Sequence, residues 1–113
     1  MNKKTKTKLF GGPNIETMIK GIEHIDSRMT EVHAAGIKYT QITNSDLIND
    51  EQKGLVNVLI NYLAKLNVAL FECKQEMAFY GSSDRFKSLV KKSHNRNKDV
   101  DDALLDLWNA VKR

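Results

Sequence analysis

Apolar residues recur at three- and four-residue steps along most of the chain, which is the spacing of one face of an α-helix. The first such stretch predicts a helix over about 14–35. Pro13 suits its first turn, where a missing N–H costs nothing, and Gly36 suits its end. The apolar stripe consists of Ile15, Met18, Ile19, Ile22, Ile25, Met29 and Val32. Such a narrow stripe is typical of a helix that packs on another helix at a shallow angle.

The second stretch is the longest and predicts a helix over about 50–80 that ends at Gly81. Asn49 is placed to cap its N-terminus, with Gln52 three residues later in the spacing of a capping box. The apolar face consists of Leu55, Val58, Leu59, Tyr62, Leu63, Leu66, Ala69, Leu70, Cys73, Met77 and Tyr80. A helix of this length with one apolar face needs partners along its whole length.

The C-terminal third predicts two helices with a loop between them. Apolar residues favour a short helix over about 84–92, whereas the segment 93–98 is polar, basic and free of apolar residues. Asn97 would then cap a last helix over about 98–112, with Asp99, Asp101 and Asp102 in its first turn, where they favour the positive end of the helix dipole. Its apolar face consists of Val100, Leu104, Leu107, Trp108 and Val111.

Together these elements predict an all-α fold. The helices at about 14–35 and 50–80 form a long hairpin, joined over 36–48 and covered by the short and the C-terminal helices. The only candidate strand is the short segment 38–42. The 113 residues fit one domain, so we expect a flexible basic arm over 1–12 in front of a single helical domain over 13–113. We also expect a homo-oligomer that associates through the first two helices.

Charge is distributed unevenly along a chain whose net charge is +4. The first eight residues contain four lysines and no acid, and residues 85–98 contain six basic residues and no acid. Between them, residues 9–84 hold ten acidic and six basic residues, and four aspartates follow after residue 98. Two basic segments on an acidic body suggest an anionic partner. The alternative is that both segments are simply solvated.

Residue types that carry catalysis or bind metals are sparse. A single cysteine, Cys73, cannot form an internal disulfide. His24 and His33 are nine residues apart, whereas two metal ligands on one helical face are four apart. We therefore predict no catalytic residue, no metal and no cofactor. No secretory signal precedes residue 13 and no apolar run reaches the roughly 20 residues of a membrane span, so we expect a cytoplasmic protein that contacts no membrane.

The remaining function is binding, and the sequence is compatible with two kinds of partner. Lysine and arginine side chains could neutralise DNA phosphates. The candidate residues are Lys3, Lys4, Lys6, Lys8, Arg85, Lys87, Lys91, Lys92, Arg96 and Lys98. The connection over 36–48 is too long for a helix-turn-helix, which favours contacts that do not read bases. Alternatively, the protein is an adaptor or inhibitor of another protein, with Ile22, Met29, Leu104 and Trp108 as interface residues. A structural bundle whose basic segment only gives solubility is a third reading.

One family resemblance rests on the order of elements over about 20–113. A helix stops at Ala35-Gly36-Ile37, and a long helix with an acidic start at Asp46 or Asp50 then runs to Gly81. Its aromatic residues are Tyr62, Phe71, Phe79 and Tyr80. A polar loop over 89–97 and a closing helix follow. This order resembles the small terminase subunits of tailed phages, although Asn97-Lys98 stands where that family commonly has Asn-Pro.

The resemblance implies a homo-oligomeric ring that recognises viral DNA and passes it to a large ATP-dependent motor subunit. On this basis we expect a non-enzymatic, DNA-associated protein of a phage or mobile element. DNA, bound in a salt-dependent way, would be one partner, and a large motor subunit or a host protein would be another.

Overall fold

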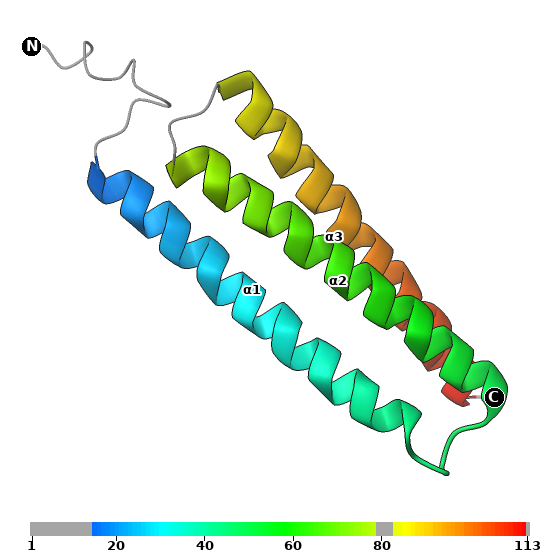
Figure 1. The fold of residues 1–113 in the computed structure, drawn as a ribbon. Coiled ribbons are helices and arrows are strands. Elements are labelled where there is room, and N and C mark those ends of the chain that lie inside the picture. The colour runs from blue at the N-terminus through cyan, green and yellow to red at the C-terminus, as the bar shows by residue number, and fades with distance from the viewer. Residues whose placement is uncertain (1–14, 79–82, 113) are drawn as a thin grey trace, which may run out of the picture.

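The computed structural model describes residues 15–78 and 83–112, and all but the connection over 44–49 are helical. The helices are α1 (Ile15–Thr43), α2 (Asp50–Ala78) and α3 (Ser83–Lys112). They lie side by side, with α2 running opposite to α1 and α3 (Figure 1). The all-α fold expected from the sequence is therefore confirmed. The basic arm predicted over 1–12 and the helix end predicted at Gly81 lie outside the described residues.

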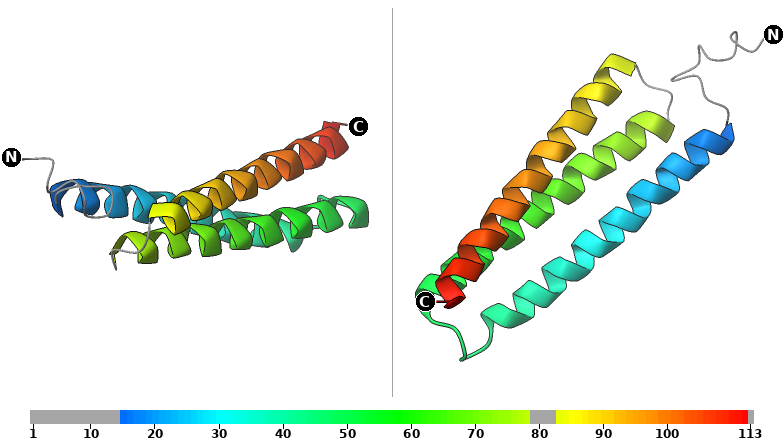
Figure 2. Two further views of the ribbon diagram at one scale, coloured as in Figure 1. Left: turned by 90° about the horizontal axis from the view of Figure 1, so that it is seen from above. Right: turned by 180° about the vertical axis from the view of Figure 1, so that it is seen from behind.

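Helix α2 supplies most of the core because it packs against both other helices (Figure 2). Its buried residues are Val56, Leu59, Leu63, Leu66, Ala69 and Cys73. Val32 of α1, together with Val100 and Ala103 of α3, joins the central cluster around Leu59 and Leu66. Burying one such leucine side chain contributes about 1.5–3 kcal/mol. The spacing of apolar residues on α2 thus fixes where both neighbours pack.

The capping box predicted at the start of α2 is present. The backbone N–H of Gln52 donates to Asn49 Oδ1 at 2.8 Å, and the backbone N–H of Asn49 donates to Gln52 Oε1 at 3.0 Å. Gln52 Nε2 also donates to the carbonyl oxygen of Ala110 at 3.4 Å. The same side chain therefore caps α2 and contacts the last turns of α3.

Helix α1 continues past Gly36 to Thr43, so the predicted stop at residue 35 was wrong, and the segment 38–42, the only candidate strand in the sequence, is helical. The connection shortens from 36–48 to 44–49. A glycine inside a helix costs about 1 kcal/mol relative to alanine. Packing offsets this cost, since Ala35 and Tyr39 on either side of Gly36 pack against the core cluster.

Helix α3 is unbroken, so the predicted division into helices over 84–92 and 98–112 with a loop over 93–98 was wrong. The polar segment stays helical because its side chains have partners. Ser93 Oγ donates to the carbonyl oxygen of Leu89 at 3.1 Å, and Arg96 Nε lies 3.1 Å from Asp99 Oδ2. Asn97 bonds to α1 rather than capping a helix. The basic segment is therefore a helix surface and not a loop.

Helix α2 has one further property, which follows from its composition. Among the described helices it alone is long and apolar enough to cross a membrane. Core helices of soluble proteins meet the same criterion, and in this structure α2 lies against α1 on one side and α3 on the other.

Candidate nucleic-acid interface

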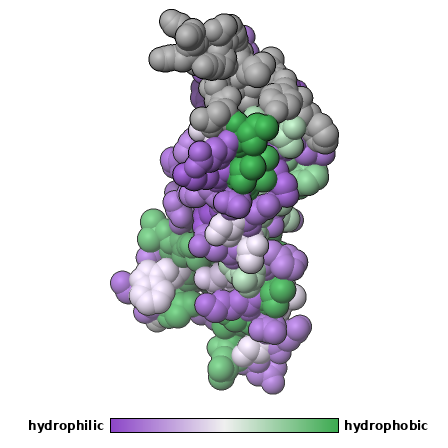
Figure 3. All heavy atoms as spheres, turned by 90° about the vertical axis from the view of Figure 1, so that its left-hand side faces the viewer, coloured by the Kyte–Doolittle hydropathy of each residue, from purple (hydrophilic) through white to green (hydrophobic). Residues whose placement is uncertain are grey.

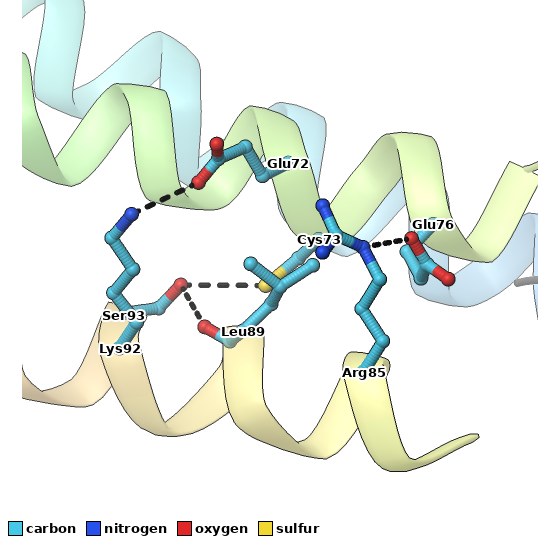
Figure 4. Close-up of polar contacts among 7 residues, drawn as sticks. All are labelled: Glu72, Cys73, Glu76, Arg85, Leu89, Lys92 and Ser93. Atoms are coloured by element: carbon cyan, nitrogen blue, oxygen red, sulfur yellow. Dashed lines mark hydrogen bonds and ion pairs between the residues drawn. The ribbon is translucent and has the colours of Figure 1, made fainter. Parts of the chain in front are cut away.

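The six basic residues predicted as DNA contacts in the C-terminal third all lie on α3, between residues 85 and 98. Lys3, Lys4, Lys6 and Lys8 lie outside the described residues. Two of the α3 cations pair with α2. Arg85 Nε lies 2.9 Å from Glu76 Oε1, and Lys92 Nζ lies 3.3 Å from Glu72 Oε1 (Figure 4). These two pairs connect the helices, so part of the basic charge serves the fold.

Two more cations pair with aspartates one turn further along α3. Arg96 Nε lies 3.1 Å from Asp99 Oδ2, without the direction of a hydrogen bond, and Lys98 Nζ lies 3.2 Å from Asp102 Oδ2. The side chain of Lys98 is 74% exposed. Exposed pairs of this kind contribute at most about 1 kcal/mol. A phosphate group can therefore replace Asp102 as the partner of Lys98 at little cost.

The remaining two cations, Lys87 and Lys91, are exposed and form no ion pair with any residue from 15–78 or 83–112. Together with His94 and Lys98 they follow a spacing of four, three and four residues. Because α3 is one helix, this spacing places all four on one outward face. We call these four residues the outer stripe. The continuous helix brings them together, whereas the predicted loop would have scattered them.

A second basic feature lies between α2 and α3. The side chains of Lys65, Lys92 and Arg96 line an open groove with a volume of about 340 Å³, together with Asn61, Ala64 and Val68. We call it the cationic groove. Lys91 and Lys92 are consecutive, so their side chains leave α3 about 100° apart. The outer stripe and the cationic groove are therefore neighbouring parts of one surface.

Lys65 and Asn61 were missed by the sequence reasoning. Lys65 belongs to the net acidic segment 9–84, and counting charge along the chain hides a cation that the fold places beside two others. Its ammonium group lies 5.5 Å from the centre of the Tyr62 ring, within the range of a cation–π interaction. No signal in the sequence identifies Lys65 as a contact, because its position beside Lys92 and Arg96 depends on how α3 packs on α2.

The four residues predicted as a protein interface are placed differently from one another. Ile22 and Met29 are half-buried in α1, and Leu104 packs against the core cluster. Trp108 is 59% exposed, with Lys112 Nζ 5.8 Å from the centre of its ring. Leu105 and Val111 beside it are also more than half exposed. The C-terminal part of α3 therefore carries an exposed apolar patch formed by Leu105, Trp108 and Val111.

Further exposed apolar side chains lie on α1. Ile15, Ile19 and Ile37 are each at least 50% exposed. Figure 3 views the molecule from the side on which α1 lies and shows separate hydrophobic patches on a largely hydrophilic surface. Single exposed apolar residues are common on soluble proteins and need no partner.

The one cysteine is buried on α2 and faces α3 (Figure 4). Its Sγ lies 3.4 Å from Ser93 Oγ, whose own proton goes to the carbonyl oxygen of Leu89. Burial raises the pKa of the Cys73 thiol, a hydrogen bond with Ser93 lowers it in part, and the nearby charge of Glu72 raises it. Reactive cysteines have a lowered pKa, so the environment of Cys73 favours an inert thiol.

Within the described part of the chain, no three His, Cys, Asp or Glu residues are grouped so that they could hold a metal ion. No family model matches this chain, and no curated protein or solved structure shows significant similarity to it. The resemblance to small terminase subunits stays a prediction. Two features on which it partly rested, the helix stop at 35–37 and the loop over 89–97, are helical in the structure.

Proposed function

We propose that this protein is a non-enzymatic, DNA-associated helical protein that binds the phosphate backbone through the cationic groove and the outer stripe. The observation that carries the proposal is the meeting of Lys65, Lys92 and Arg96 around one open groove. Lys91 of the outer stripe directly precedes Lys92 in the sequence, so it lies on the face of α3 next to the cationic groove. The groove thus brings cations from two helices together, which suits contact with the phosphate backbone.

The polar residues between these cations suit phosphate as the ligand. Asn61 lines the groove, and Ser88 and Asn95 are exposed on α3. Asparagine and serine side chains commonly donate to phosphate oxygens beside lysine and arginine. Contacts of this kind position a protein on DNA without reading its sequence. We therefore propose binding that depends on charge and shape and not on bases.

The strength of such binding depends on salt. Each neutralised phosphate contributes a slope of about −0.9 to the change of log affinity with log salt. Four phosphate contacts would lower the affinity roughly a hundredfold between about 50 and 200 mM salt. The intramolecular aspartate and glutamate partners compete with phosphate, so the count of contacts is smaller than the count of cations.

The resemblance to small terminase subunits supports a more specific role, which is the recognition of viral DNA for packaging in a phage or mobile element. In that role the protein works in the cytoplasm as a homo-oligomer, and its protein partner is a large motor subunit. The cationic surface supports only the DNA contact, and the packaging role depends on the resemblance.

Fluorescence anisotropy with a labelled mixed-sequence duplex tests the DNA contact. Lys65→Gln and Lys91→Gln each remove a cation, and neither residue has an ion pair within the described helices. Each change is expected to weaken binding several-fold at low salt. Lys38→Gln on α1 is the matched control, since Lys38 is exposed and lies on a different helix. Equal affinity of all three variants, or no binding by the wild type at low salt, contradicts the proposal.

A second candidate function is that of an adaptor which binds another protein. The exposed ring of Trp108, with Leu105 and Val111 beside it, supports it. Aromatic residues are enriched among those that dominate binding energies at interfaces. Trp108→Ala separates the two functions, because it is expected to leave DNA affinity within twofold while it removes any binding that depends on the apolar patch.

A further inference from the structure

A second open groove lies between α1 and α3 and has a volume of about 350 Å³. Its polar lining residues come from both helices, whereas α2 contributes only apolar side chains. The lining residues are His24 and Arg28 of α1, Leu66 and Leu70 of α2, and Ser93, His94 and Asn97 of α3. We call it the histidine groove. Since His94 also belongs to the outer stripe, the histidine groove borders the surface that the proposed function assigns to DNA.

Several hydrogen-bond donors of this groove have no acceptor among residues 15–78 and 83–112. His24 and His94 are exposed and form no hydrogen bond or ion pair with these residues. Asn97 accepts a bond from Arg28 through Oδ1, so both hydrogens on its Nδ2 remain to donate. Arg28 uses Nη2 for this bond and Nη1 for Glu31 at 3.3 Å, which leaves three of the five N–H groups of a guanidinium. The groove therefore offers donors to an acceptor from outside the chain.

The charges of the lining favour an anion as this acceptor. Among the described residues that line the groove there is no acid, and Arg28 is a permanent cation. A histidine side chain changes from neutral to positive between about pH 8 and pH 5, and both ring nitrogens of an imidazolium donate. The groove is therefore weakly cationic at pH 8, whereas at lower pH two imidazolium groups add their charge to that of Arg28.

The neighbouring cations oppose protonation of the two histidines until an anion binds. Lys91 and Lys98 lie about one turn on either side of the α3 histidine, and Lys20 lies one turn before the α1 histidine. Lys20 is paired with Glu16 at 3.5 Å. A like charge nearby favours the neutral imidazole, whereas a bound phosphate favours the charged one. Binding of an anion and uptake of protons are therefore linked.

The acids that follow on the same faces of α1 and α3 lie towards one end of the groove. Glu31 is seven residues after His24, and Asp101 is seven residues after His94, which is about two turns in each case. Glu31 is also held by Arg28. An anion between the two histidines is thus separated from both carboxylates.

We propose that the histidine groove holds a phosphate of the DNA backbone when His24 and His94 are protonated, so that DNA affinity rises as the pH falls from 8 to 6. The inference rests on the proposed function, adds α1 to the contact with DNA and makes that contact sensitive to pH. Lysine and arginine stay charged over this pH range. The cationic groove therefore contributes equally at both ends of the range.

Fluorescence anisotropy with a mixed-sequence duplex, at pH 6 and pH 8 and equal ionic strength, tests the inference. Wild-type affinity is expected to be roughly three- to tenfold higher at pH 6. The slope of log affinity against log salt should also be larger in magnitude by about 0.9 at pH 6, as for one more phosphate contact. The His24→Gln/His94→Gln double variant keeps polar side chains that take up no proton. It is expected to bind within twofold of the wild type at pH 8 and to gain no affinity at pH 6.

His33→Gln is the matched control, because His33 is also exposed on α1 but lines a different groove, between α1 and α2. It is expected to keep the full gain at pH 6. The α-amino group also titrates near this range, but it is the same in every variant. A gain that is lost only in the double variant is therefore due to the histidine groove.

Two results would overturn the inference while the proposed function stands. One is wild-type DNA binding of equal strength at both pH values, and the other is a double variant that keeps the gain at pH 6. A wild type that binds no DNA at either pH, even at low salt, would contradict the proposed function itself and the inference with it.

Discussion

Arg28 of α1 donates a hydrogen bond of 2.6 Å from Nη2 to Oδ1 of Asn97 in the middle of α3. The two residues are 69 positions apart, and their contact links the outer helices of the bundle. It also accounts for the continuity of α3. The Asn97 side chain, which could otherwise cap a helix N-terminus, accepts a hydrogen bond from Arg28 of α1. Helix α3 therefore continues past this residue.

The first prediction concerns this contact. Asn97→Ala is expected to lower the free energy of unfolding by about 1 kcal/mol, because a charge-assisted bond is lost while Arg28 stays partly solvated. The better helix propensity of alanine offsets part of the loss. Asn97→Ser should behave in the same way. If Asn97 were instead an N-cap, serine would preserve the stability. Urea denaturation, with a double-mutant cycle that includes Arg28→Ala, distinguishes the two.

The second prediction concerns the continuation of α1 through Gly36. Alanine at this position meets no atom within 4 Å, so Gly36→Ala is expected to stabilise the protein by about 0.5–1 kcal/mol. If Gly36 instead ended the helix with a left-handed backbone conformation, the same change to alanine would destabilise the protein. Gly21→Ala is the matched comparison, since its Cβ would lie 2.9 Å from Met77 Sδ. That variant should be less stable than Gly36→Ala in thermal denaturation.

The third prediction concerns the core along α2. Leu59 is fully buried, whereas Val58, one position earlier, is 45% exposed. Leu59→Ala is expected to cost about 2–5 kcal/mol because it leaves a cavity between three helices. Val58→Ala should change stability by less than about 0.5 kcal/mol. Similar losses for both variants in denaturant titrations would mean that α2 is not oriented as described.

The fourth prediction concerns Cys73. Its pKa is raised in the folded state, first by burial. The thiol therefore stabilises the fold below its unfolded pKa of about 8.5, and this contribution is lost as the pH rises towards the raised folded pKa. Between pH 7 and pH 9.5 the wild type should lose more stability than Cys73→Ala.

Alkylation gives a second measure of the same thiol. Iodoacetamide should react with the native protein much more slowly than with the protein in denaturant. Equal rates in both conditions would show that Cys73 is accessible and would remove the basis for the pH effect.

The sequence was most informative where one pattern depended on local spacing alone. The capping box of Asn49 and Gln52 and most of the apolar face of α2 follow from neighbours within one or two turns. The exceptions on α2 are Val58, which was predicted on that face and is 45% exposed, and Val56, which is fully buried and was not predicted. The all-α fold follows from the same spacing, repeated in three segments. These features need no knowledge of what packs against them.

The wrong predictions concern segments whose structure depends on tertiary contacts. Gly36 was predicted as a stop because its propensity is poor, but Tyr39 beyond it packs against the core. Residues 93–98 were predicted as a loop because they lack apolar side chains, but Arg28 of α1 satisfies Asn97. Lys65 was overlooked as a candidate contact because only the fold places it beside Lys92 and Arg96.

The salt dependence of DNA binding tests the proposed function most directly. Affinity for a mixed-sequence duplex would be measured across salt concentrations for the wild type and for the Lys65→Gln/Lys91→Gln double variant. We predict a linear log–log plot for both, with a slope whose magnitude falls by about 1.8 in the double variant, since two phosphate contacts are lost. Identical slopes, or a wild type that does not bind DNA even at low salt, would contradict the account.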